Sequence, residues 1–291
     1  MRSNNQNKNY EDGGPVIVIV GPTGSGKTGI AVEIAKEIER RRIGGFLGAE
    51  IISADSRAVF KGMDLGTAKP TLLERQGVKH YGFDLVQPGE RFTVKDWKDY
   101  AREKILEIQK EGKLPIVVGG TGFYIDALVF DYKFQVQGVG YDKNRGECIK
   151  NLNGKNGTVV QNDKDKYPDR QKMCSEYVVF GIDWNPKELK KRLAMRAEQM
   201  FCSELYEETR QLVKEYDWDN QAMKSDIYEF AWKYLEGELT REEAIRLTTI
   251  EDWHLAKRQL TWFKRNENIL WLPLDKIKAS VIKCIQDEQR K

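Results

Sequence analysis

The chain has 291 residues, of which 40% are hydrophobic and 32% charged, enough for one large domain or two modest ones. Its 48 basic and 45 acidic side chains leave a formal net charge of +3, so charge alone does not indicate a nucleic-acid-binding protein. The four cysteines lie far apart and form no CxxC pair, which argues against a zinc site and against a disulfide framework.

The N-terminal segment, residues 1–14, is polar and lacks the apolar core of a secretory signal. The apolar run VIVIV that follows it is far too short to span a membrane. We therefore expect a disordered tail, no membrane contact and a cytoplasmic protein.

Apolar runs alternate with helical patterns along the chain, which is typical of an α/β protein with a parallel sheet. The runs occupy residues 15–20, 50–53, 115–118, 177–182 and 269–272. After the first run, isoleucines spaced four residues apart predict a helix over residues 28–42. The pattern predicts a sheet that is buried between helices.

Two further helices are marked by their first residues. Thr93 with Asp96 and Thr240 with Glu243 have the spacing of a capping box, in which a side chain at each end satisfies a backbone N–H of the other. The second of these helices is predicted to run to about residue 265, in a C-terminal part that is mostly helical after residue 186.

The segment GPTGSGKT matches the phosphate-binding pattern G-x-x-x-x-G-K-[ST]. A predicted strand precedes it and a predicted helix follows, which is the context that a P-loop requires. Backbone N–H groups and the helix N-terminus would hold an anion, Lys27 would add a charge, and the Thr28 hydroxyl would bind Mg²⁺. The candidate phosphate-binding residues are Gly21, Pro22, Thr23, Gly24, Ser25, Gly26, Lys27 and Thr28.

A P-loop usually binds ATP or GTP, but the usual companions of these nucleotides are hard to find. The sequence lacks the Asn-Lys-x-Asp motif with which GTP-binding proteins recognise guanine. The strand predicted at 115–118 is followed by Gly119 and Gly120, where an ATPase would carry the acid of its Walker B motif. This argues against ATP hydrolysis.

Asp55 follows the strand predicted at 50–53, at the sheet edge where the P-loop also lies. A carboxylate there could bind Mg²⁺ or accept a proton from a substrate. It could equally be a helix cap, which is common for Asp-Ser pairs. The pattern alone leaves both readings open.

Residues 133–176 interrupt the α/β alternation and are rich in Gly, Asn, Asp and Lys, which predicts a long loop or a reduced insertion. We divide the chain into a tail (1–14), a P-loop core (15–132), this insertion, and the rest of the core with a helical C-terminal region (177–291).

Five segments occur together in this order: GPTGSGKT, ISADSRAVFKGMDLGTAKP, PIVVGGTGFYIDAL, YLEGELTREEAI and LAKRQLTWFKR. Together they resemble the tRNA dimethylallyltransferase family, over most of the chain outside 1–14 and 133–176. The resemblance implies an α/β, P-loop NTPase-like fold whose loop holds dimethylallyl diphosphate rather than ATP. The dimethylallyl group would go to the exocyclic amine of the adenosine next to the tRNA anticodon.

The same resemblance implies roles for particular residues. Asp55 would be the base, with Thr23 and Lys27 also catalytic, Thr28 binding Mg²⁺ and Lys224 helping to hold the diphosphate. Residues implied to contact tRNA are Asp55, Ser56, Arg57, Ala58, Thr121, Lys257 and Arg258. We expect the aromatic side chains at 262–263 to lie in the core rather than on RNA, and the protein to be a monomer.

The chain departs from the family in its short insertion, in Ile227 before Tyr228, and in Asp252-Trp253 where relatives favour Thr-Arg. One alternative is an adenylate isopentenyltransferase acting on a free nucleotide. Others are a P-loop kinase and a tRNA-binding protein without catalysis. The GTAKP and AKRQLTWF segments favour the tRNA enzyme.

Overall fold

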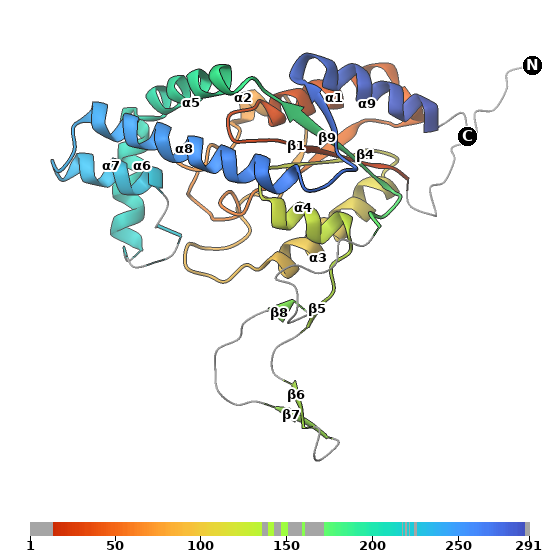
Figure 1. Ribbon diagram of the computed structural model, residues 1–291, viewed down its shortest axis with the longest axis horizontal. Coiled ribbons are helices and arrows are strands. Elements are labelled where there is room, and N and C mark those ends of the chain that lie inside the picture. Colours follow the sequence, from red (N-terminus) through yellow and green to blue (C-terminus); the bar gives the residue numbers. More distant parts are fainter. Residues whose placement is uncertain are drawn as a thin grey trace, which may run out of the picture.

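A computed structural model describes residues 14–135, 139–142, 147–150, 159–160, 172–216, 218, 220, 222–223 and 226–288. Its main sheet has six strands, all paired in parallel, in the order β10-β9-β1-β4-β2-β3 (Figure 1). The strands are β1 (Val16–Val20), β2 (Ala49–Ala54), β3 (His80–Tyr81), β4 (Leu114–Gly119), β9 (Tyr177–Asp183) and β10 (Leu270–Pro273). Each of the five predicted strands begins and ends within one residue of these bounds, and the predicted α/β fold is confirmed.

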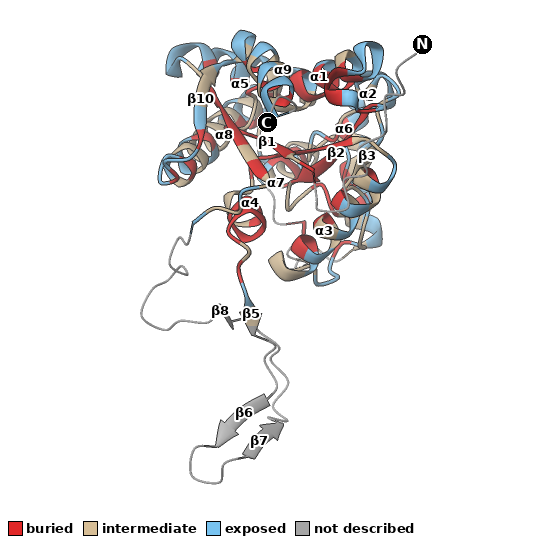
Figure 2. Ribbon diagram, turned by 90° about the vertical axis from the view of Figure 1, so that its right-hand side faces the viewer, coloured by how far each residue is buried: buried red, intermediate tan, exposed pale blue. Residues whose placement is uncertain are grey.

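The sheet is covered by helices on both faces, and alternating side chains of each strand face opposite sides. In β1, Ile17 and Ile19 pack toward α1 and α9, whereas Val18 and Val20 pack toward α3 and α4. Figure 2 shows the buried residues concentrated along the central strands and the helix faces that cover them. The helices are α1 (Lys27–Arg41), α3 (Val94–Lys110), α4 (Gly122–Val129) and α9 (Leu274–Glu288).

Four helices between β9 and β10 form a second packing unit, which we call the helical unit. They are α5 (Pro186–Met200), α6 (Ser203–Glu215), α7 (Asp226–Leu235) and α8 (Arg241–Phe263). A separate apolar cluster that includes Phe201, Tyr228 and Met63 holds α6 and α7 together with the loop after β2. Figure 1 shows α8 running from α6 and α7 at one end to α4 at the other.

The predicted helix starts are confirmed by their capping contacts. Thr93 Oγ1 accepts from Asp96 N at 3.2 Å, and Asp96 Oδ2 accepts from Thr93 N at 2.8 Å. Thr240 and Glu243 make the same reciprocal pair at the start of α8. That helix ends at Phe263, close to the predicted residue 265.

Short elements that the patterns did not predict complete the chain. They are a 3₁₀ turn (Ile43–Gly45), α2 (Leu72–Arg75) and four strands that pair as β5 (Phe134–Gln135) with β8 (Val159–Val160) and β6 (Val139–Asp142) with β7 (Glu147–Lys150). These two antiparallel ladders fall in the segment predicted as a loop or reduced insertion. The predicted tail, except for Gly14, lies outside the described residues. Within the ranges that the model describes, no helix is long and apolar enough to cross a bilayer.

The topology places a crevice at one edge of the sheet. Neighbouring strands β1 and β4 lead into helices on opposite faces, α1 and α4. At such a switch point the loops after the two strands diverge, and ligands of open α/β sheets bind between them. The P-loop follows β1 here, and the Gly119-Gly120 turn follows β4.

Candidate active site at the carboxyl ends of the strands

The predicted P-loop joins β1 directly to α1. Gly24 and Gly26 have φ angles of 71° and 83°, in the left-handed region that favours glycine. A Cβ on Gly24 would also lie 2.6 Å from Leu193 Cδ2 of α5. Both glycines are therefore required by backbone geometry and close packing, as the pattern predicted.

Two features of this loop suit it to binding an anion. The N-terminus of α1 presents backbone N–H groups without intrahelical partners. Ser25 is fully buried, and its Oγ has no hydrogen-bond partner among the described residues. An unpaired buried hydroxyl is costly unless a ligand satisfies it. The loop is thus built to hold a group with several acceptor oxygens, such as a phosphate.

Lys27 supplies the charge of the site. Its Nζ donates to Pro22 O at 2.7 Å. Burial lowers the pKa of the amine to about 8, with a further lowering from Arg196, while the negative charge of Asp55 opposes the shift. A cation held in so dry a place is stabilised further by a bound anion.

Helix α5 adds two cations that the sequence patterns did not reveal. Arg196 Nη1 donates to Thr23 Oγ1 at 2.7 Å, and Arg192 Nε donates to Gly24 O at 2.6 Å. Trp184 Nε1 also donates to Ser25 O at 3.0 Å. The two arginines are four residues apart and so share one helix face. Their spacing was the only sequence signal for these two arginines, and many helices carry basic residues four apart, so it could not identify them as site residues.

Helix α8 supports the loop through Gln259, which was also missed. Gln259 Oε1 accepts from Thr23 N at 2.7 Å. A Cβ on Gly120 would lie 2.3 Å from Gln259 Nε2, so only glycine leaves room for this amide. One side chain of α8 therefore bridges the loops that follow β1 and β4.

Asp55 forms a tight turn after β2. Its Oδ1 accepts from Arg57 N at 2.8 Å and from Ala58 N at 3.3 Å. The capping interpretation is therefore correct for one carboxylate oxygen, although the structure capped is a turn rather than a helix. The same contacts fix the orientation of a carboxylate whose charge acts on Lys27. Asp55 can therefore hold the turn with one oxygen and still act on a metal or a substrate proton with the other.

Thr121 brings the loops after β2 and β4 together. Ser56 N donates to Thr121 Oγ1 at 3.0 Å, and Thr121 N donates to Ala54 O at 3.2 Å. A Cβ on Gly119 would lie 2.1 Å from Ala54 O. No side chain fits there, which explains physically why this strand does not end in the acid of an ATPase.

Lys257 and Arg258 lie on the exposed side of α8, away from Gln259. With His254, Thr261, Trp262 and Arg265 they line a shallow hollow of about 600 Å³. The expected core position of Phe263 is confirmed, since it is buried. Trp262 is half-buried, and its Nε1 donates to Asp126 Oδ2 at 2.9 Å. The hollow offers cations and one aromatic edge beside the crevice.

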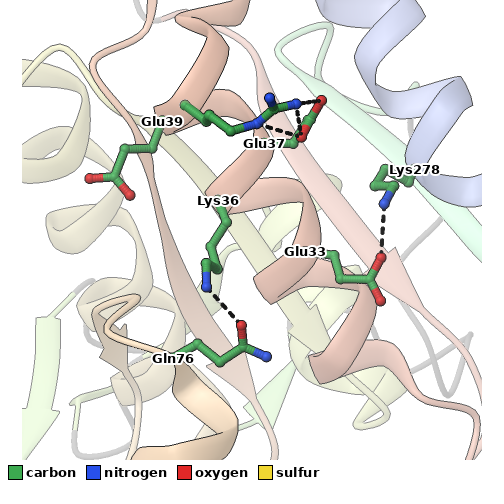
Figure 3. Close-up of a pocket in the computed structure, with 7 residues that line it drawn as sticks. Glu33, Lys36, Glu37, Glu39, Gln76 and Lys278 are labelled. Atoms are coloured by element: carbon green, nitrogen blue, oxygen red, sulfur yellow. Dashed lines mark hydrogen bonds and ion pairs between the residues drawn. The ribbon is translucent and has the colours of Figure 1, made fainter.

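Another hollow, of about 470 Å³, lies on the outer surface of α1, α2 and α9 (Figure 3). Several of its side chains pair with one another: Lys278 Nζ lies 3.0 Å from Glu33 Oε2, and Lys36 Nζ donates to Gln76 Oε1 at 2.8 Å. By the helical rise, Lys36 lies about 13 Å beyond Lys27 along α1. This hollow is remote from the crevice.

Two predicted ligand positions remain. Lys224 lies outside the described residues. Thr28 lies in the first turn of α1, where its hydroxyl is one oxygen ligand of the kind that Mg²⁺ takes together with phosphate oxygens. In the described part of the chain, no group of three or more His, Cys, Asp and Glu could hold a metal. The phosphates of a substrate would supply further oxygen ligands to Mg²⁺ at this place.

Comparisons with known proteins show which family this chain resembles. The family model described as IPP transferase matches residues 58–157 and 148–266. The tRNA dimethylallyltransferase of Desulforudis audaxviator is 35% identical over 295 residues, covering 90% of this chain and 92% of that protein.

Two crystal structures have the same fold. One is the full-length tRNA isopentenylpyrophosphate transferase of Bacillus halodurans, with a TM-score of 0.75, 27% identity, and coverage of 95% of this chain and 97% of that one. The other is the tRNA delta(2)-isopentenylpyrophosphate transferase of Staphylococcus epidermidis, with a TM-score of 0.70, 28% identity, and coverage of 95% and 99%. This chain belongs to the IPP transferase family.

Proposed function

We propose that this chain is a prenyltransferase that moves the dimethylallyl group of dimethylallyl diphosphate onto tRNA. The acceptor is the exocyclic amine of the adenosine 3′ to the anticodon. The bond from the allylic carbon to the diphosphate oxygen breaks, the bond from carbon to nitrogen forms, and the amine loses a proton. The observation that carries the proposal is that an anion loop and an oriented carboxylate, Asp55, meet at one sheet edge.

The donor binds through the P-loop. Departing diphosphate gains negative charge, and fixed N–H donors with cations stabilise charge that develops in a transition state. Lys27 and the Thr23 hydroxyl are the catalytic groups on this side, and Arg196, already in contact with Thr23, adds a further cation. Of the remaining loop residues, Gly21, Gly24 and Gly26 would supply backbone N–H donors and Ser25 its unpaired hydroxyl, whereas Pro22 has no N–H and would contact the donor without donating. Lys224 is proposed from the sequence alone to help hold the diphosphate.

Mg²⁺ is proposed as the metal, held by Thr28 and by the diphosphate oxygens. When bound, it would neutralise part of the charge on the leaving group. Because Thr28 would contribute one oxygen ligand and Mg²⁺ takes several, we expect the donor to strengthen metal binding.

The acceptor adenine binds at the turn after β2. Its amine is a weak nucleophile, and Asp55 can take the proton that is lost on alkylation. The neighbours Ser56, Arg57 and Ala58 contact the base, and Thr121 closes the same side through its bond to Ser56. The two oxygens of Asp55 have different roles: Oδ1 accepts the hydrogen bonds of the turn, and Oδ2 is the proton acceptor.

An anticodon loop suits this site because its bases are unpaired and can leave the stack at low cost. Lys257 and Arg258 on α8 are proposed to bind RNA phosphates beside the crevice. We expect the enzyme to work as a monomer in the cytoplasm.

The test uses purified protein, Mg²⁺ and radiolabelled dimethylallyl diphosphate. Two acceptors are offered side by side, an anticodon stem-loop with adenosine after the anticodon and free AMP. Asp55→Ala is the control variant. The expected result is label in the stem-loop that is lost in the variant. Label only in AMP would instead identify an adenylate isopentenyltransferase, and ATP turnover without label would identify a kinase-like enzyme.

A further inference from the structure

The loop after β2 is tied to the helical unit by one carboxylate. Glu208, on α6, accepts from Leu65 N at 2.9 Å and from Gly66 N at 3.2 Å. It also accepts from Tyr228 Oη, on α7, at 2.5 Å. A carboxylate can accept several hydrogen bonds, and bonds to an ionised acceptor are about twice as strong as neutral ones. Three donors from two different elements converge on this one side chain.

The contact is built for close approach. Tyr228 is buried, and a Cβ on Gly66 would lie 2.3 Å from its Cζ, so only glycine allows the loop to lie against the ring. Burial and the negative charge of Glu208 both raise the pKa of the Tyr228 hydroxyl. The hydroxyl therefore stays protonated and keeps donating to the carboxylate throughout the working pH range.

A second anchor holds the other end of the same loop. Lys69 is buried, and its Nζ lies 2.8 Å from Asp64 Oδ1 and 2.6 Å from Asp84 Oδ1, while also donating to Phe60 O at 2.6 Å. This lysine binds only to the core part of the chain. Glu208 is thus the polar link from the loop to the helical unit, whereas Lys69 fixes the loop's own shape.

The link joins two parts of the site that contact different regions of the acceptor. Upstream of Gly66 lies the turn of Asp55, and downstream of Tyr228, across the contact of α7 with α8, lie Lys257 and Arg258. The start of α7 is also close to that turn. Burial raises the pKa of the Asp226 carboxyl there, and the charges of Arg258 and Arg57 oppose the rise.

We propose that Glu208 is a positioning residue for the RNA acceptor, fixing the Asp55 turn relative to the cations of α8. This inference rests on the proposed function of the site. The P-loop depends instead on β1, α1, α5 and Gln259, none of which Glu208 contacts through its hydrogen bonds. Loss of the link should therefore weaken use of the acceptor and leave use of the donor unchanged.

The experiment measures steady-state KM for the anticodon stem-loop and for dimethylallyl diphosphate in wild type, Glu208→Gln and Tyr228→Phe. Glutamine removes the charge and places an amide against backbone donors. Phenylalanine removes one hydroxyl and keeps the ring against Gly66. Glu207→Gln is the matched control, because Glu207 is the adjacent residue of α6, is exposed, and contacts only side chains of its own helix, Arg210 at 3.6 Å and Gln211 Nε2 at 3.3 Å, in the described structure.

We expect Glu208→Gln to raise KM for the stem-loop about tenfold, Tyr228→Phe to raise it about threefold, and both to leave KM for the donor within about twofold. Glu207→Gln should match wild type. Equal rises in both KM values, or a lower thermal midpoint with unchanged KM for RNA, would reduce Glu208 to a structural role. If Glu208→Gln does not fold, the same comparison of the two KM values in Tyr228→Phe tests the proposal. Wild-type protein without transfer to the stem-loop would refute the proposed function itself.

Discussion

The two halves of the crevice are assembled in different ways. The donor half, Gly21–Thr28, is one continuous loop between a strand and a helix. The acceptor half, the turn at 55–58 with Thr121, combines the ends of two strands and is joined by the bond from Ser56 N to Thr121 Oγ1 at 3.0 Å. A continuous loop carries its geometry in its own residues, whereas a divided site depends on the whole sheet.

The supports of the two halves also differ. Arg192, Arg196 and Gln259 hold the donor half from α5 and α8. Glu208 and Tyr228 hold the loop beyond the acceptor half from α6 and α7. The helical unit thus contacts both halves through separate side chains. Substitutions can therefore be chosen that disturb one half and spare the other.

The largest expected effect comes from Asp55→Asn, which isolates proton acceptance in the acceptor half. Asparagine keeps an oxygen that can accept from Arg57 N and Ala58 N, so the turn should survive. The general base is lost, which is expected to lower kcat by about 10²–10⁴. Steady-state kinetics with labelled donor test this. A loss below about tenfold would mean that Asp55 only holds the turn.

Lys27→Met should act on the donor half alone. The variant removes the cation that faces the leaving diphosphate, and we expect kcat/KM for the donor to fall about 10²–10³-fold. Binding of the stem-loop, measured by fluorescence anisotropy without donor, should be unchanged because Lys27 begins α1, directly after the loop that follows β1. A comparable loss of RNA affinity would show that the two halves are not separable.

This difference between the halves also explains what could be predicted from the sequence. The P-loop was predictable because its glycines, lysine and threonine are adjacent, and Asp55 because it follows a recognisable strand. The role of Arg196 could not be predicted, because it lies 173 residues from its partner Thr23 in the chain. Gln259 and Glu208 were missed for the same reason: their contacts depend on how the helical unit packs, and no local pattern encodes that packing.

Gly120→Ala is a smaller perturbation that connects the halves. The new Cβ would lie 2.3 Å from Gln259 Nε2, so the amide must move and Thr23 N loses its acceptor. We expect kcat/KM for the donor to fall about tenfold and the free energy of unfolding to fall by about 1–3 kcal/mol. Gly29→Ala is the control, because nothing lies within 4 Å of its Cβ position.

Gly29→Ala, in the first turn of α1, should stabilise the protein by at most about 0.5–1 kcal/mol. Denaturant unfolding and the transfer assay are run on both variants. Full activity in Gly120→Ala would show that Gln259 does not position the loop.

The smallest effect is a pH dependence confined to the donor half. Burial lowers the pKa of Lys27 to about 8, so the amine is charged below that pH and neutral above it. Since kcat/KM reports ionisations of the free enzyme, its value for the donor should halve near pH 8 and fall up to about tenfold by pH 9. Lys27→Arg should remove this fall, because a guanidinium stays charged over the whole range.

The pH dependence of the thermal midpoint distinguishes loss of the Lys27 charge from denaturation. The pKa of Lys27 is lower in the folded protein than its usual value of 10.5. Between these two values the unfolded chain binds more protons at this residue, so this residue's contribution to the free energy of unfolding rises with pH while activity falls. A thermal midpoint that holds or rises from pH 7.5 to 9, together with falling kcat/KM, assigns the loss to the charge of Lys27. If the thermal midpoint and kcat/KM fall together, the loss of activity is due to unfolding. The donor half would then not be separable from the rest of the fold.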